Sequence, residues 1–121
     1  MSNVYWGEPT WTFFHTLAEK VKEEEYNNIK EELLKIIKQI CMNLPCPDCR
    51  KHATNHMSRI KIVNVQNKEM LKDMLFTFHN NVNRRTNAEI KSKKILETYK
   101  SKDFTDVFIN FVRQFSKPIH N

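Results

Sequence analysis

Two cysteines separated by two residues are the feature of this sequence best suited to chemistry. Cys46 and Cys49 lie in the stretch LPCPDCRKH, which covers residues 44–52. Two thiols at this spacing can close a disulfide with little rearrangement, and so can exchange electrons with another dithiol. Three kinds of site share the pattern: a redox pair, half of a zinc site, and two buried thiols that never react.

A zinc site would need further ligands, and His52 and His56 extend the pair into a C-x-x-C-x-x-H-x-x-x-H row. If this row lies along one helix, Cys46 and His56 are about 15 Å apart at about 1.5 Å per residue. Tetrahedral zinc needs all its ligands at about 2.0–2.3 Å, and they usually come from two separate elements. The sequence holds no second C-x-x-C. We therefore favour a redox pair and predict no bound metal.

The residues around the pair predict a helix that begins at the first cysteine. Pro45 ends the preceding helix, and Pro47 suits the first turn of a new helix over residues 46–56. Unpaired N–H groups and the helix dipole favour a thiolate at such a terminus. A thioredoxin-like module is disfavoured, because the chain shows no alternation of strands and helices around its C-x-x-C.

The composition predicts one all-α domain over residues 1–121. A hydrophobic fraction of 40% is typical of a globular chain, and the few turn residues disfavour an all-β fold. Gly7 is the only glycine, which excludes both the P-loop and the G-x-G-x-x-G dinucleotide turn. No apolar run reaches the ~18 residues of a membrane span, and no secretory signal is recognisable at the N-terminus. We therefore expect a reducing, cytoplasmic compartment.

The formal charge of +6 allows one alternative function. The 20 basic and 14 acidic residues are spread along the chain, which is typical of a solvated surface. A small basic helical protein that binds nucleic acid is the alternative reading.

Hydrophobic periodicity predicts five helical segments, with no repeat and no linker long enough to divide domains. They cover residues 8–21, 27–43, 46–56, 68–88 and 104–115. Residues 59–67 are predicted to form an extended loop, and their β-branched run is the one plausible short strand. Asp103 can cap the fifth helix, whose phenylalanine-rich face we expect to be buried in the fold or against a partner chain.

Two polar clusters on separate helices suggest a cofactor site. Trp11 and His15 are four residues apart and share a helix face, as do His79 and Asn83, with Asn80 beside them. These groups are expected at the border of the core, where each histidine could simply be a satisfied polar residue. Together they could stack a planar ring and meet its hydrogen-bonding edges. A bound cofactor or another protein must accept the electrons of the dithiol, because nothing else in the chain is redox-active.

Three motifs in this order and spacing resemble the Erv/ALR family of FAD-linked sulfhydryl oxidases: WGEPTWTFFHTLAE, PCPDCRKH and FHNNVNRR. The resemblance covers the chain from Trp6 to about Arg85, and the size is similar to the minimal versions of large cytoplasmic DNA viruses. It implies four helices around FAD plus a short fifth, and a homodimer. It also implies oxidation of a protein dithiol to a disulfide, with electrons passing through FAD to O2 to give H2O2.

The resemblance also implies roles for individual residues. Cys46 and Cys49 would be the redox pair, with Cys49 nearer the flavin ring and Cys46 exchanging with the substrate. The H-N-x-x-N residues would hold the adenosine part of FAD, and Arg85 would meet its pyrophosphate. The residues expected to bind the cofactor are Gly7, Trp11, His15, His52, His79, Asn80, Asn83 and Arg85.

The chain departs from the family pattern in two respects. Cys41 is the only other cysteine, so there is no shuttle pair, and we interpret it as a buried thiol. Cys46 should then engage a separate thiol protein, such as a small thioredoxin- or glutaredoxin-like protein. The segment after Arg85 matches the family poorly, so no cofactor contact is predicted there. For a viral chain the expected location is the host cytoplasm, the virus factory or the virion.

Overall fold

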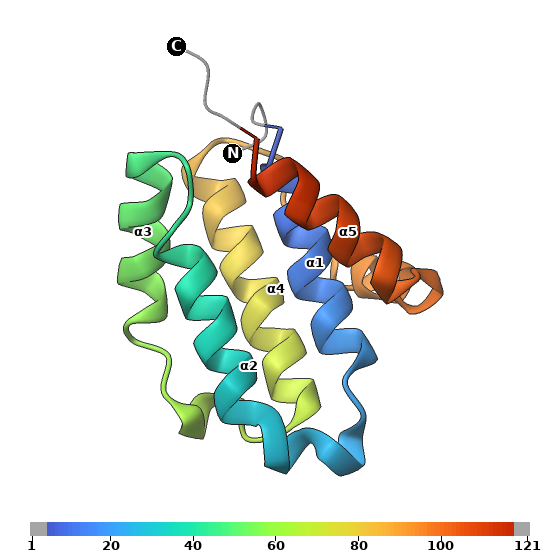
Figure 1. Cartoon of the computed structure of the whole chain (residues 1–121). Helices are drawn as coiled ribbons and strands as arrows, with labels where there is room; N and C mark the ends of the chain where they lie inside the picture. The colour runs from blue at the N-terminus through green and yellow to red at the C-terminus, as the bar shows by residue number, and fades with distance from the viewer. Residues whose placement is uncertain (1–4, 118–121) are drawn as a thin grey trace. The chain divides into compact units, whose positions relative to one another are not determined.

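Helices make up all the regular structure of residues 5–117, the part of the chain that the computed structural model describes. The five α-helices are α1 (Gly7–Lys20), α2 (Tyr26–Cys41), α3 (Pro47–Met57), α4 (Lys68–Arg85) and α5 (Phe104–Phe115) (Figure 1). Three 3-10 helices lie between them: η1 (Glu23–Glu25), η2 (Ile62–Val65) and η3 (Lys93–Ser101). The predicted all-α class is confirmed. Within residues 5–117, no helix is both long and apolar enough to cross a lipid bilayer.

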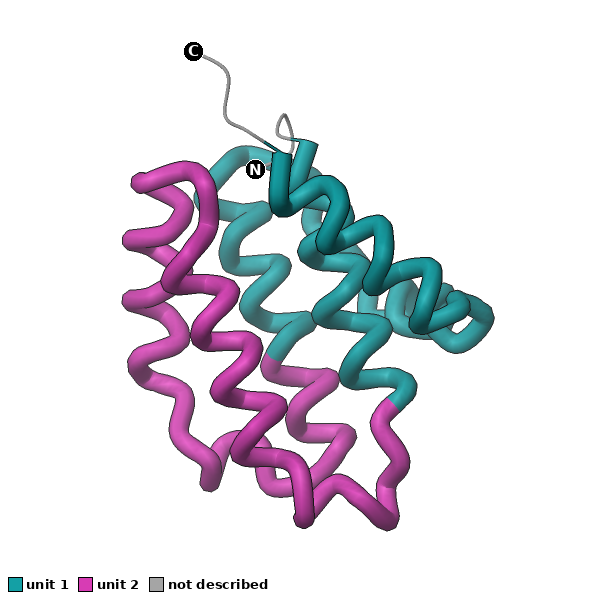
Figure 2. Tube along the Cα trace, viewed as in Figure 1, with its two compact units in different colours: residues 1–20, 75–121 teal, residues 21–74 magenta. Residues whose placement is uncertain are grey.

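The chain divides into two compact units, coloured separately in Figure 2. The first contains residues 1–20 and 75–121, and the second contains residues 21–74. The boundary falls inside α4, so this helix contributes to both units. The two polar clusters predicted from the sequence belong to the first unit, and the cysteine pair belongs to the second. The prediction of one domain over residues 1–121 stays a prediction.

The predicted helix bounds are close for α1, α2, α3 and α5, whereas α4 ends three residues before the predicted position 88. The cause is Asn87, which adopts a left-handed conformation with φ 61°. Asparagine tolerates this region better than most residues and often follows the end of a helix there. The N–H of Ala88 then donates to the carbonyl of Asn83 at 2.7 Å, which closes the helix.

The segment at residues 59–67 is not the extended loop or strand that its β-branched residues suggested. Residues 62–65 form η2, because Asn64 Oδ1 accepts the backbone N–H of Lys61 at 2.8 Å. Val65 is fully buried, and its carbonyl accepts the Tyr26 hydroxyl at 2.6 Å. A strand without a neighbour would have left these backbone groups unpaired, so the local turn is the better solution.

In the second unit, the apolar stripe of α2 is buried where this helix packs on α3. The residues that share this burial recur at three- and four-residue steps, as expected for one helix face. They are Leu33, Leu34, Ile37 and Cys41 on α2, with Ala53 and Met57 on α3. Ile36, on the same helix, is 44% exposed.

In the first unit, α5 packs on α1 through phenylalanine rings. Phe13 stacks on Phe111 with ring centroids 4.6 Å apart and planes 9° from parallel. Phe111 is buried, but Phe108 and Val112 are 44% and 42% exposed. Within this chain the phenylalanine-rich face is therefore only partly buried, because α1 covers only the side of α5 that packs against it. Burial of the remainder against a partner chain stays a prediction.

The start of α5 confirms the capping residue expected from the sequence. Asp103 has extended backbone angles, and its Oδ2 accepts the N–H of Asp106 at 3.0 Å. This bond satisfies one of the N–H groups that every helix start leaves unpaired.

We predict that Phe111→Ala lowers the free energy of unfolding by about 3 kcal/mol, because it removes a buried ring and leaves a cavity against Phe13. Urea unfolding followed by circular dichroism measures the change. Val112→Ala, on the exposed side of the same helix, should cost less than about 0.5 kcal/mol. Equal effects of the two substitutions would contradict this packing of α5.

Candidate active site

Cys46 stands at the N-cap of α3, as the sequence predicted. Its backbone is extended, with φ −88° and ψ 119°, and Pro47 follows in the first turn of the helix. The Sγ of Cys46 accepts the backbone N–H of Cys49 at 3.2 Å. Both cysteines are free and partly exposed. The pair is therefore accessible at a helix start.

The environment of Cys46 favours its thiolate. Partial burial opposes ionisation, but the Cys49 side chain and the backbone N–H groups of Cys49 and Asp48 all donate hydrogen bonds to the sulfur. These bonds hold the pKa of Cys46 below its ordinary value, although the charge of Asp48 acts in the other direction. A lowered pKa raises the thiolate fraction near neutral pH and also makes the sulfur a better leaving group.

Cys41 has the opposite environment. It lies on the buried face of α2 with 1% of its surface exposed, and burial raises the pKa of its thiol to about 12. A neutral thiol in an apolar setting is chemically inert, so the interpretation of Cys41 as a buried thiol agrees with the structure.

The two histidines of α3 do not complete a metal site. His52 is exposed, and its Nε2 lies 3.6 Å from Asp48 Oδ1 one helical turn earlier. Burial, with a smaller effect of Arg59, lowers the pKa of His56. In the described part of the chain, no three His, Cys, Asp or Glu side chains come together as metal ligands could. His52 lies on α3, three residues after Cys49, and so belongs to the same helix as the dithiol.

The two polar clusters predicted from the sequence meet in the first unit. Trp11 of α1 stacks on His79 of α4 with centroids 4.0 Å apart and planes 7° from parallel. His15 Nε2 and His79 Nδ1 are 2.9 Å apart and share a hydrogen bond. Tyr99 of η3 stacks on the His15 ring with centroids 4.9 Å apart. His15 is only 3% exposed and Asn83 only 8%, so these groups lie deeper than the core border that was predicted.

Both histidines are neutral near pH 7. Burial, together with the neighbouring His79, lowers the pKa of His15 to about 3. Burial, together with the charge of Lys91, lowers the pKa of His79 to about 4. One ring therefore donates the hydrogen bond between them and the other accepts it. His15 Nδ1 is buried and no group within residues 5–117 bonds to it.

A pocket of about 210 Å³ opens beside this ring stack. Two carboxylates and one ammonium group line it, which gives a net formal charge of −1 with His79 neutral. A nearly uncharged pocket with an aromatic wall and amide groups suits a flat ring with polar edges better than a phosphate group. The lining residues are Gly7, Glu8, Trp11, His79, Asn83, Thr86, Ala88, Glu89 and Lys91.

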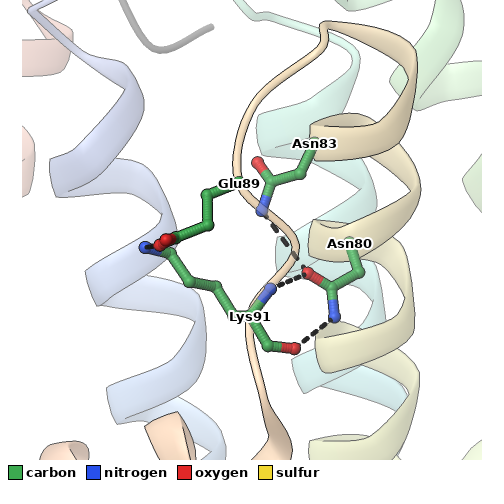
Figure 3. Close-up of polar contacts among 4 residues, drawn as sticks. All are labelled: Asn80, Asn83, Glu89 and Lys91. Atoms are coloured by element: carbon green, nitrogen blue, oxygen red, sulfur yellow. Dashed lines mark hydrogen bonds and ion pairs between the residues drawn. The ribbon is translucent and has the colours of Figure 1, made fainter.

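Residues 86–91, which we call the strap, follow α4 and form one wall of the pocket. Asn80 Oδ1 accepts the N–H of Lys91 at 2.9 Å, and Asn80 Nδ2 donates to the Lys91 carbonyl at 3.0 Å (Figure 3). Asn83 Nδ2 donates to Asn80 Oδ1 at 3.4 Å. The Asn80 side chain of the H-N-x-x-N motif thus joins the strap to α4, and the Asn83 side chain bonds to Asn80.

The structure brings together most of the residues predicted to bind the cofactor. Gly7, Trp11, His79 and Asn83 line the pocket, His15 lies against His79, and Asn80 holds the strap. Arg85 is exposed and does not line this pocket, and His52 belongs to the second unit.

The residues that sequence reasoning missed are Glu8, Thr86, Ala88, Glu89 and Lys91. Glu8 could have been found beside Gly7, but the others depend on the turn at Asn87 and on the Asn80 bonds.

The neutral histidine pair predicts a loss of stability in acid. Each histidine has a folded-state pKa below its ordinary 6.5, so the unfolded chain binds protons first. The contribution of the two neutral histidines to the free energy of unfolding should be fully present above about pH 6.5. It should fall by about 1.4 kcal/mol per pH unit per histidine as the pH drops toward about 4. Unfolding free energies measured from pH 7 to 4.5 give this slope.

His79→Gln, which keeps a hydrogen-bonding group beside His15, should make the slope shallower, whereas His52→Gln on the exposed face of α3 should not. A slope that is the same in the wild type and in His79→Gln would contradict the burial of a neutral histidine pair.

Comparison with known proteins gives the family. The model of the Erv1 / Alr family matches residues 8–105. The chain is 32% identical over 89 residues to the FAD-linked sulfhydryl oxidase of African swine fever virus (isolate Pig/Kenya/KEN-50/1950), with 74% of each chain covered. It is 30% identical over 78 residues to the FAD-linked sulfhydryl oxidase ERV1 of Arabidopsis thaliana, which covers 64% of this chain and 40% of that protein.

A relative from Invertebrate iridescent virus 3 is 27% identical over 97 residues, which cover 78% of this chain and 66% of that protein. No solved structure shows a significant match. The family match spans the cysteine pair of α3, the aromatic residues of α1 and the H-N-x-x-N motif of α4. The chain therefore belongs to the Erv1 / Alr family.

Proposed function

We propose that this chain is an FAD-dependent sulfhydryl oxidase, which oxidises the dithiols of a protein substrate to disulfides with O2 as the final acceptor and H2O2 as the product. The observation that carries the proposal is the position of Cys46 at the N-cap of α3, where hydrogen bonds lower the pKa of its thiol. The family match and the names of the relatives support the flavin chemistry. They give no support to the nucleic-acid alternative.

The residues of the first unit fit part of a flavin dinucleotide. Trp11 and His79, stacked face to face, form an aromatic wall of the pocket, and His15 Nδ1 is a buried polar atom that no described group satisfies. Asn83 adds an amide to the lining. These groups match the flat, polar-edged adenosine part of FAD, and Gly7, Trp11, His79 and Asn83 would hold it. When bound, FAD supplies a two-electron acceptor that reoxidises the dithiol and passes the electrons to O2.

The cysteine pair performs the exchange with the substrate. Starting from a Cys46–Cys49 disulfide, a substrate thiolate attacks Cys46 Sγ, and the Cys46–Cys49 bond breaks as a mixed disulfide forms. The second substrate thiolate attacks the substrate sulfur of this mixed disulfide, so the substrate disulfide forms and Cys46 leaves as a thiolate. The substrate loses two electrons and two protons, and Cys46 and Cys49 receive the electrons. The N–H of Cys49 stabilises the departing thiolate of Cys46.

The order of attack follows from the two positions. Cys46 holds the partly exposed N-cap position, where a substrate thiolate can reach it, and its stabilised thiolate is a good leaving group when the mixed disulfide is resolved. Cys49 lies one turn into α3 and would be the sulfur that passes electrons to the flavin, as the family resemblance implies.

The substrate is proposed to be a separate thiol protein, such as a small thioredoxin- or glutaredoxin-like protein. The chain has three cysteines, and the third, Cys41, is buried with a raised pKa. No second pair can therefore relay electrons within the chain. We further propose that the enzyme acts in the cytoplasm, where a viral relative of this kind would meet its substrates.

A homodimer is also proposed, in keeping with the family resemblance. The exposed apolar side chains of α5, Phe108, Ile109 and Val112, offer a surface for a second copy. Sedimentation velocity on the purified protein separates a dimer from a monomer directly.

The proposed activity predicts a yellow protein whose oxygen consumption depends on Cys46 and Cys49. Cys46→Ser and Cys49→Ser should each lower oxygen consumption with dithiothreitol by about 100-fold or more, because the dithiol cannot form, while the visible absorbance of bound flavin stays. Cys41→Ser is the matched control and should keep most of the wild-type rate, since this thiol is buried and inert. A colourless protein that takes up no added FAD, or full turnover by Cys46→Ser, would contradict the proposal.

A further inference from the structure

The side chain of Asn80 is occupied by the protein itself. An asparagine amide offers one carbonyl oxygen and one NH2 group. Lys91 uses both, through its backbone N–H at 2.9 Å and its carbonyl at 3.0 Å, and Asn83 Nδ2 shares the oxygen at 3.4 Å. Asn80 is 8% exposed, so these bonds are largely shielded from water. Paired bonds of this kind hold a chain segment in place more firmly than one bond does.

The segment held by Asn80 builds much of the pocket. α4 ends at Arg85, and the left-handed Asn87 turns the chain back, so that Lys91 returns to the level of Asn80. Of the nine residues that line the pocket, four belong to the strap: Thr86, Ala88, Glu89 and Lys91. The position of this wall therefore depends on where Lys91 is fixed.

The strap reaches from α4 toward α1. The side chains of Glu89 and Lys91 point from it toward α1 in Figure 3, and Lys91 Nζ pairs with Glu89 Oε1 at 2.8 Å. Hydrogen bonding to Glu89 raises the pKa of Lys91, and the charge of Glu8 on α1 adds to the effect. Exposed ion pairs contribute little to stability, so the buried bonds of Asn80 are the main anchor of the strap.

Asn83 has a different position from Asn80. It lines the pocket and is 8% exposed, and its Nδ2 is directed to Asn80. No donor in residues 5–117 reaches its Oδ1 within hydrogen-bonding distance. This oxygen can therefore accept an N–H of a ligand, whereas the oxygen of Asn80 already accepts two hydrogen bonds.

We propose that Asn80 is a positioning residue that fastens the strap as a wall of the adenosine pocket, while Asn83 contacts the ligand directly. The identity of the ligand rests on the proposed function, but the fastening of the strap does not. The sequence resemblance implied that both asparagines hold the cofactor, and the hydrogen bonds divide these tasks between them.

Two measurements on the full chain test this division. Hydrogen exchange of the Lys91 amide, followed by NMR, reports the fastening, and the dissociation rate of FAD reports the pocket. Asn80→Ala should speed both by about 10-fold or more, because it removes two buried hydrogen bonds. Asn83→Ala should speed FAD dissociation and leave the Lys91 amide as protected as in the wild type.

Three controls separate positioning from a general loss of structure. Asn81→Ala, next in sequence but with an exposed side chain that accepts a hydrogen bond from Arg84, should change neither rate. Asn80→Asp keeps the acceptor for the Lys91 N–H but loses the donor to the Lys91 carbonyl, so it should restore only part of the protection. FMN lacks the adenosine part, so Asn80→Ala should change FMN affinity by less than about 2-fold, whereas a misfolded protein would lose FMN and FAD together.

The proposal is overturned if the Lys91 amide in Asn80→Ala exchanges as slowly as in the wild type, or if FMN binding is lost along with FAD. A wild-type chain that binds no FAD would instead overturn the proposed function. In that case the Lys91 exchange rates in Asn80→Ala and Asn81→Ala still decide whether Asn80 fastens the strap.

Discussion

The hydrogen bond from the Cys49 N–H to Cys46 Sγ is the interaction on which the proposed chemistry of this chain depends. Cys46 Sγ lies at the start of α3, where N–H groups stabilise a negative charge, and Cys49 follows three residues later in the same helix. Pro45 and Pro47 flank Cys46. Pro45 prevents the preceding helix from continuing to this point, and Pro47 suits the first turn of α3. A dithiol with one stabilised thiolate is thus a direct consequence of four consecutive residues, and it needs no long-range contact.

A chain with one glycine must build a nucleotide site without a glycine-rich loop, and the pocket of the first unit, where we propose this site, is lined by side chains instead. Trp11, His15 and His79 form a stack whose histidines are neutral because they are buried. The strap then turns back at Asn87 and is tied to α4 through Asn80, which gives the pocket its remaining wall. The binding surface therefore consists of packed aromatic rings and amides, and its stability depends on the same burial that keeps the rings uncharged.

The sequence allowed prediction of whatever depends on local spacing. The helix starts, the cap at Asp103 and the pairing of Trp11 with His15 on one face of α1 follow from proline rules, capping and i, i+4 spacing, and all are present. The end of α4, η2 and the strap could not be predicted, because each depends on a left-handed asparagine or on bonds to distant residues. The exposed face of α5 shows the same limit. A strong amphipathic pattern indicates that a face can be buried, but the neighbours decide how much of it is.

The most direct test of the central claim is an anaerobic titration of the flavin-loaded protein with a dithiol, followed by the visible absorbance of the flavin. If Cys46 receives electrons from the substrate and passes them on through Cys49, two equivalents of dithiol, one for the disulfide and one for the flavin, should bleach the flavin of the wild type. The flavin of Cys46→Ser should remain oxidised over the same period. Bleaching of Cys46→Ser at the wild-type rate would show that electrons reach the flavin without this sulfur, and would contradict the account.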